Sequence, residues 1–185
     1  MPEKFYGTEE FFKGIAVQKE AYIFYEQLLE KANEDIKNYV MENITYNHGE
    51  KSYLVMLRIL KCLPVCEFRS ELKQRVWWVM HHEGANHVDK TLPQEFVQEL
   101  KKLTDRYMAR YDKFEEVEND LAKYVLQTLS NEKLEKNPEV YRKIIPLLPY
   151  GKLRLRMCAR YFNLEEGTKM LDKSLKSTKR SETCR

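Results

Sequence analysis

Apolar residues recur at alternating steps of three and four along most of the chain, which is the spacing of amphipathic helices. The first such stripe follows Thr8, a residue suited to cap a helix, and is followed by a polar stretch at residues 33–35. The stripe contains Phe11, Ile15, Gln18, Tyr22, Tyr25, Leu29 and Ala32. A second helix is expected over residues 36–61, so the pattern predicts a helical hairpin at the start of the chain.

The same spacing predicts a helix over residues 70–83, with Ser70 as its cap. Its inward positions are expected to be Leu72, Val76, Val79 and Met80. A much longer helix is expected over residues 92–130, where neither glycine nor proline interrupts after the first turn. Its stripe runs over about five heptads and contains Phe96, Leu100, Leu103, Tyr107, Arg110, Phe114, Val117, Leu121, Tyr124 and Thr128.

At ~1.5 Å per residue the helix over residues 92–130 would be close to 60 Å long, more than a compact bundle of this size needs. It could bend near residues 110–112 and pack within the chain, which its aromatic positions favour. The alternative is a coiled coil with a second copy, which would make a homodimer through residues 92–130.

Asn137 followed by Pro138 predicts a further helix start. After a turn at residues 149–151, two short helices are expected over residues 152–162 and 168–177, and residues 179–185 are expected to be disordered. The fold class is therefore all-α. We expect a helical bundle over residues 1–131 with one long central helix, and a small basic helical unit over residues 137–178.

Composition indicates the class of protein and the compartment in which we expect it. Charged residues make up 33% of the 185 residues, yet 43% apolar and 12% aromatic content is too rich for a disordered chain. No apolar run approaches the ~18 residues of a transmembrane helix, and the first residues lack a signal-peptide pattern. We therefore expect an intracellular protein, cytoplasmic or nuclear, that does not contact a membrane, and we interpret its four cysteines as reduced thiols.

Positive charge is concentrated at the end of the chain. Residues 149–185 carry ten lysines and arginines against four acidic residues, although the whole chain has a net charge of only +3. Here the sequence predicts an inward apolar face of Leu155, Cys158, Ala159 and Phe162. Basic positions that could contact phosphates or an acidic partner are Lys152, Arg154, Arg156, Arg160, Lys169, Lys173 and Lys176.

The stretch LPYGKLRLRMCARYFNLEEG resembles helix-turn-helix regulators, including the LP-x-x-x-R opening of sigma-factor carboxy-terminal regions. After Asn163, however, the apolar spacing is out of step with a recognition helix. The resemblance implies contact with nucleic acid through the basic helices.

A cysteine–histidine cluster is the candidate metal site. Cys62, Cys66, His82 and His87 have a spacing that overlaps the two-cysteine, two-histidine pattern, and thiolate and imidazole are the ligands that tetrahedral zinc prefers. The alternative is that the protein has no cofactor and that the two cysteines are small buried groups.

The segment EAYIFYEQLLEKANEDIKNYVMENITYNHGEKSYLVMLRIL, within residues 9–62, resembles the first helix pair of ferritin-like proteins, the rubrerythrins in particular. The resemblance places Glu20 at the first-helix ligand and His48 at the second-helix histidine. It implies a bundle, but Thr45 replaces the glutamate of the Glu-x-x-His motif, so the metal motif is not retained.

Three functions follow from these patterns, and they favour a protein that is not an enzyme, because the chain has no phosphate-binding loop and no nucleophile elbow. The first is a non-catalytic helical module that contacts nucleic acid or an acidic protein surface through its basic carboxy-terminal helices. The second is a metal-binding helical protein, with zinc or a degenerate ferritin-like site. The third is a self-associating scaffold for protein interactions.

Overall fold

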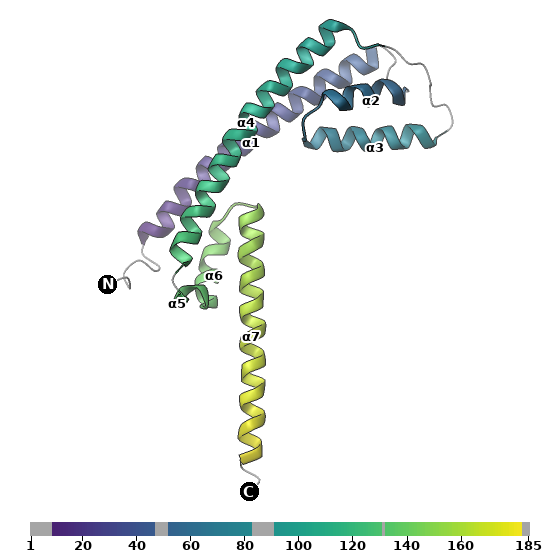
Figure 1. Cartoon of the computed structure of the whole chain (residues 1–185). Helices are drawn as coiled ribbons and strands as arrows, with labels where there is room; N and C mark the ends of the chain where they lie inside the picture. The colour runs from purple at the N-terminus through teal and green to yellow at the C-terminus, as the bar shows by residue number, and fades with distance from the viewer. Residues whose placement is uncertain (1–8, 47–51, 83–90, 131, 183–185) are drawn as a thin grey trace. The chain divides into compact units, whose positions relative to one another are not determined.

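The fold is all-α, as the sequence predicts (Figure 1). The computed structural model describes residues 9–46, 52–82, 91–130 and 132–182, and their side chains except those of residues 45, 46, 132, 133, 168 and 170–182. The elements are α1 (Glu9–Tyr46), α2 (Tyr53–Cys62), α3 (Glu67–His81), α4 (Gln94–Leu129), α5 (Glu132–Glu135), α6 (Pro138–Ile144), the 3-10 helix η2 (Ile145–Leu147) and α7 (Lys152–Glu182).

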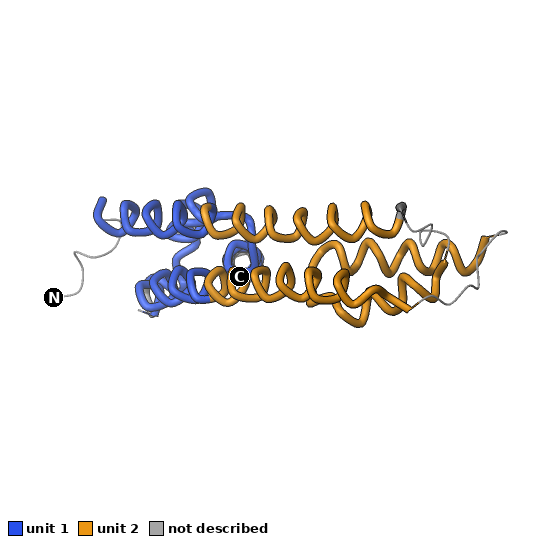
Figure 2. Tube along the Cα trace, turned by 90° about the horizontal axis from the view of Figure 1, so that it is seen from above, with its two compact units in different colours: residues 1–23, 116–185 blue, residues 24–115 orange. Residues whose placement is uncertain are grey.

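The chain forms two compact units (Figure 2). Unit 1 contains residues 1–23 and 116–185, and unit 2 contains residues 24–115. The division passes through α1 and α4, whereas the sequence analysis placed a boundary between residues 131 and 137. No helix in the described ranges is both long and apolar enough to cross a membrane.

The break expected at residues 33–35 is wrong, because α1 continues through them. Asn33 is buried, and its side-chain oxygen accepts a hydrogen bond of 3.0 Å from the backbone N–H of Phe68. Phe68 lies in the first turn of α3, where backbone N–H groups lack partners within their own helix. Cys66 holds the N-cap position of α3 but makes no capping bond with its side chain. Asn33 therefore caps α3 from α1, which is why a polar residue is retained inside a long helix.

Unit 2 has a core made from all four of its helices. Lys37 and Glu71 form an ion pair of 2.9 Å between α1 and α3, and Arg110 donates to the Leu28 carbonyl at 2.9 Å between α4 and α1. The largest side chains fully buried in this unit are Phe68, Ile36, Met56, Ile59, Leu72 and Leu100.

Helix α3 begins at Glu67, not at the expected cap Ser70, and it buries Leu72, Val76 and Val79 as predicted. Met80, which we expected to face inward, is exposed, and so are both tryptophans of the chain. Trp77 stacks on His81 and Trp78 on His82, with ring centroids 4.6 and 3.9 Å apart. Nδ1 of each histidine lies 2.7 Å from the carbonyl oxygen of its tryptophan. Since a carbonyl only accepts hydrogen bonds, each Nδ1 carries the proton.

Helix α4 runs without interruption, so the chain does not fold back near residues 110–112, and the helix packs within the chain. In unit 2 the rings of Phe96 and Tyr39 stack with centroids 5.3 Å apart. In unit 1 the rings of Tyr124 and Phe11 stack at 5.5 Å. Every position of the predicted stripe on α4 is buried or half-buried, which confirms that stripe.

Unit 1 is built around the start of α1, the end of α4 and the helices that follow. Gly14 allows α1 and α4 to approach closely, because a Cβ there would overlap the Tyr124 hydroxyl. The Tyr22 hydroxyl donates to the Tyr150 carbonyl at 3.2 Å. Asn137 accepts a hydrogen bond from the Glu139 backbone N–H at 3.0 Å, which confirms it as the cap of α6 with Pro138 in the first turn.

Candidate partner-binding surface on helix α7

Helix α7 is attached to unit 1 by one side of its first turns. Leu153 and Met157, one helical turn apart, are buried together with Tyr141 and Ile144 of α6 and Leu148 after η2. Figure 1 shows α7 running back along α6 and continuing well beyond it. Among the described side chains of α7, the buried ones therefore lie at the beginning of the helix.

The apolar face predicted to pack inward is in fact exposed. Leu155 is 72% exposed and Phe162 is 63% exposed, and Cys158 and Ala159 between them are also exposed. We call these four residues the α7 stripe. The prediction failed because α7 carries two apolar stripes on opposite sides, and the packed one is that of Leu153 and Met157.

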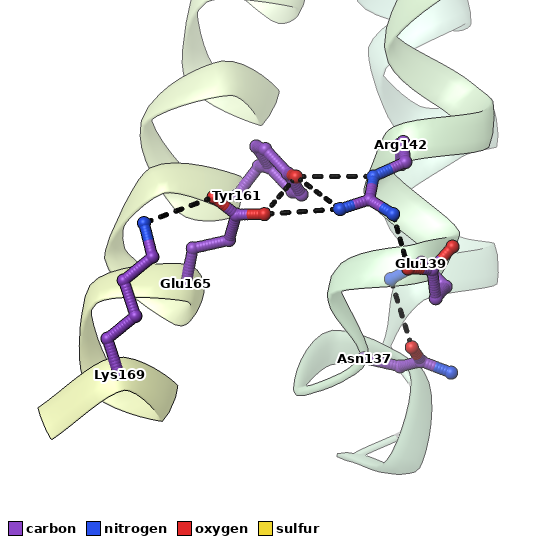
Figure 3. Close-up of polar contacts among 6 residues, drawn as sticks. All are labelled: Asn137, Glu139, Arg142, Tyr161, Glu165 and Lys169. Atoms are coloured by element: carbon purple, nitrogen blue, oxygen red, sulfur yellow. Dashed lines mark hydrogen bonds and ion pairs between the residues drawn. The ribbon is translucent and has the colours of Figure 1, made fainter. Parts of the chain in front are cut away.

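A polar cluster between α6 and α7 fixes which side of α7 faces the unit (Figure 3). Arg142 of α6 donates to the Tyr161 hydroxyl at 3.0 Å and to the Glu165 carboxylate at 3.2 Å. The Tyr161 hydroxyl in turn donates to Glu165. Arg142 also pairs with Glu139 at 2.7 Å on its own helix. These bonds hold Tyr161 and Glu165 towards α6, so that the α7 stripe is directed away from α6.

The same cluster shifts the ionisation of its members. The hydrogen bond from Tyr161, followed by the positive charges of Lys169 and Arg142, holds the pKa of Glu165 below its usual value. The pKa of Arg142 is raised, mainly by its hydrogen bond to Tyr161 and by the carboxylate of Glu139. Glu165 is therefore ionised at neutral pH, when it can accept both bonds from α6 and α7.

Most of the predicted basic residues have partners inside unit 1. Lys152 lies 3.6 Å from Glu118, Arg160 lies 3.6 Å from Glu135, and Lys169 lies 3.8 Å from Glu165. Arg154 donates to the Leu148 carbonyl at 3.2 Å and lies over the ring of Tyr150, 4.1 Å from its centroid. These four predicted basic residues are therefore engaged with partners in their own unit.

Arg156 differs from the other cations, because it is exposed and makes no ion pair with any residue that the structure describes. It lies three residues before Ala159 on the helix, so it borders the α7 stripe. The ion pairs of Lys152 and Arg160 each have one exposed member and a separation of 3.6 Å, so each contributes about 1 kcal/mol or less, and an acidic partner can compete for both cations. Lys173 and Lys176 lie on α7, but their side chains are outside the described part of the chain.

The two short helices expected at the end of the chain are one helix in the structure. Residues 163–167 continue α7 without a turn, and residues 179–182, expected in a disordered tail, are also helical. Gly167 has open space around it and does not end the helix. A helix-turn-helix needs a turn between its two helices, so α7 lacks that arrangement.

The candidate zinc ligands are not brought to one point. Cys62 is exposed at the end of α2, and Cys66 is buried at the start of α3, where burial raises the pKa of its thiol. His82 follows the other end of α3, and a helix of 15 residues separates its ends by roughly 22 Å, about ten times a zinc–ligand distance. His87 lies outside the described residues. No group of three or more metal-ligating side chains occurs in the part of the chain that the structure describes.

No protein-family model, curated protein or solved structure matches this chain. The resemblance to rubrerythrins therefore stays an expectation from the sequence. The helix boundary that it implies is wrong, because Glu20 and Thr45 lie on the same uninterrupted helix. Glu20 is exposed there, and His48 lies outside the described residues.

The sequence analysis missed the polar cluster between α6 and α7, both the Tyr161–Glu165 bond and the bonds from Arg142. The spacing of Tyr161 and Glu165, four residues apart on a helix, was a signal that could have been used. Arg142, by contrast, comes from a different helix, and the sequence holds no local signal that pairs it with Tyr161.

Proposed function

We propose that this chain is a non-catalytic binding module that docks an acidic, amphipathic helix of a partner protein along the first turns of α7. The observation that carries the proposal is the exposure of Leu155 and Phe162, 72% and 63%, on a helix whose opposite side is already packed. Apolar side chains of this size that stay exposed in a row at helical spacing are typical of helix-binding surfaces.

Charge determines the type of partner. Arg156 has no described ion-pair partner and borders the α7 stripe, while Lys152 and Arg160 continue the same side at intervals of four residues. A partner helix with leucines facing the stripe and glutamates facing these cations would bury the apolar groups and replace the weak internal ion pairs.

Nucleic acid is the weaker alternative for the same surface. Phosphate groups would pair with Arg156 but would leave Leu155 and Phe162 exposed. Self-association through α4 is also weaker, because the stripe that would form the dimer seam packs within the chain. The acidic helix is the partner that uses both the apolar and the basic parts of the surface.

The test uses a labelled synthetic peptide of about 20 residues, long enough to form a helix, with leucine on one face and glutamate on the other. A matched peptide carries lysine in place of glutamate, and a single-stranded oligonucleotide is the third probe. Fluorescence anisotropy with the full chain should show binding of the glutamate peptide only.

Two variants locate the binding. The double variant Leu155→Ser/Phe162→Ser should weaken binding at least about ten-fold, because the stripe is lost, and Arg156→Glu should weaken it by several-fold. Val65→Ser is the matched control, since Val65 is an apolar residue of unit 2 that is 83% exposed. Unchanged binding in the double variant would refute the proposal. Oligonucleotide binding that needs Arg156 but not Leu155 would assign the surface to nucleic acid instead.

A further inference from the structure

One edge of the α7 stripe carries opposite charges at its two ends. Lys152 and Arg156 lie at the start of that edge, and Glu166 lies at its end. Ala159 and Asn163 lie between them, so these five positions follow one another at steps of four and three and form a single row along the helix. All five residues are exposed, so a helix that docks on the stripe would lie beside the whole row.

Glu166 belongs to this exposed side, although its neighbour Glu165 does not. Arg142 donates to Glu165 at 3.2 Å and holds its carboxylate towards α6 (Figure 3). The cation of Lys169 also lies next to Glu165, at 3.8 Å. One residue further along, the helix has turned by about 100°, which brings Glu166 to the side of Phe162, one turn before it. The exposed side of α7 therefore has a carboxylate directly after the last apolar residue of the α7 stripe.

The two ends of the row act separately on a partner. Lys152 and Glu166 lie on the same helix, and at ~1.5 Å per residue they are roughly 21 Å apart. This separation exceeds the Debye length of about 8 Å at physiological ionic strength, so a partner charge at one end is affected little by the other end. A helix with glutamate along its whole length would be attracted by the two cations and repelled by Glu166. The row therefore distinguishes partners by the order of their charges as well as by their net charge.

We propose that α7 selects a partner helix that runs parallel to it and whose charges change from acidic to basic along its length. This inference rests on the proposed function and specifies its partner. Acidic residues in the first turns of the partner would face Lys152 and Arg156, and a basic residue in its last turn would face Glu166. The same order of charges stabilises the partner helix through its own dipole. An antiparallel partner would need the opposite order, which its own dipole opposes.

Two labelled peptides of about 20 residues and identical composition test the order of charges. Both have leucines on one face. The first has glutamates in its first two turns and lysine in its last turn, and the second has these charges in reverse order. Fluorescence anisotropy with the full chain should show at least about five-fold tighter binding of the first peptide, and the difference should shrink at high salt. Equal affinities would overturn this inference and leave the proposed function standing, whereas binding of neither peptide would refute both.

Charge reversal at the end of the row locates the effect. Glu166→Lys should weaken binding of the first peptide roughly five-fold, as expected for one exposed ion pair. A first peptide whose lysine is replaced by glutamate should recover the affinity for this variant. Asp120→Lys is the matched control, because Asp120 is exposed on α4 of the same unit and the change in net charge is equal. An equal loss in the two variants would assign the effect to net charge and overturn the inference.

The direction of the partner is measured by cross-linking. A benzophenone group at the amino end of the first peptide should attach to α7 close to Lys152 and Arg156, and mass spectrometry of tryptic peptides locates the attachment. The same group at the carboxyl end should attach close to Glu166. The reverse pattern would show an antiparallel partner and would overturn the inference.

Discussion

Helices α3 and α7 both carry apolar stripes, but their units use those stripes differently. Helix α3 buries Leu72, Val76 and Val79 in the core of unit 2, and its first turn is capped by Asn33 from α1. Helix α7 buries Leu153 and Met157 and leaves the α7 stripe on its other side exposed. The difference shows that an apolar stripe identifies a face that can be buried, not the face that its own unit buries.

The largest expected effect on the free energy of unfolding compares a buried residue of α3 with an exposed residue of α7. Leu72→Ala removes a fully buried side chain and should lower the free energy of unfolding by about 2–5 kcal/mol, because it leaves a cavity. Leu155→Ala should change it by no more than about 0.5 kcal/mol, because the side chain is exposed. Urea unfolding followed by circular dichroism measures both. A similar loss in the two variants would show that the α7 stripe is covered in solution.

The second prediction tests whether α1 and α4 pack closely in unit 1. Gly14→Ala gains up to about 1 kcal/mol of helix propensity, but the new Cβ would overlap the Tyr124 hydroxyl. The overlap should dominate and lower the stability by about 1–3 kcal/mol. Thermal unfolding provides the measurement, and Tyr124→Leu in the same chain should recover part of the loss. A stabilised Gly14→Ala variant would mean that α1 and α4 do not approach closely there.

The third effect tests the cap of α3. Asn33→Ala leaves the buried N–H of Phe68 without its acceptor and should lower stability by about 1–2 kcal/mol. Hydrogen exchange should show faster exchange in the first turn of α3. Asn43→Ala, on the same helix, is the control, because Asn43 bonds to the carbonyl of its own helix at Tyr39. Equal exchange of α3 in both variants would contradict the role of Asn33.

The smallest effect concerns the attachment of α7 to α6. The pKa of Glu165 is lowered in the folded chain, so its contribution to stability is present above the ordinary carboxylate pKa of about 4.3 and is lost as pH falls through the lower folded value. Hydrogen exchange of α6 and of the first turns of α7 should therefore rise, relative to the rest of the chain, on acidification. Glu165→Gln should remove this pH dependence. A pH response that persists in Glu165→Gln would assign it to another carboxylate.

The positions that the sequence predicted well are those set by local spacing. They are the stripe of α4, three of the four inward positions predicted on α3, and the cap at Asn137. Each depends on residues within a few turns of one another. The break at residues 33–35 was predicted from local propensity, and it failed because Asn33 is satisfied by Phe68, 35 residues away.

The candidate site could be predicted only in part. The sequence predicted helix for these basic and apolar positions, as the structure has it, but which of the two apolar stripes of α7 is packed depends on α6 and on Arg142. Spacing alone also suggested a metal site, and the length of α3 is what separates Cys66 from His82. Both errors concern contacts between elements, which a pattern along one helix does not contain.

The two stacked pairs on α3 have a practical consequence for spectroscopy. Trp77 and Trp78 are the only tryptophans of the chain, and both lie in unit 2. Intrinsic emission therefore reports on the outer surface of one helix, next to imidazole rings that quench indoles more strongly when protonated. A ligand that occupies α7 would contact unit 1, which holds neither tryptophan, so its binding is better followed with a label on the ligand.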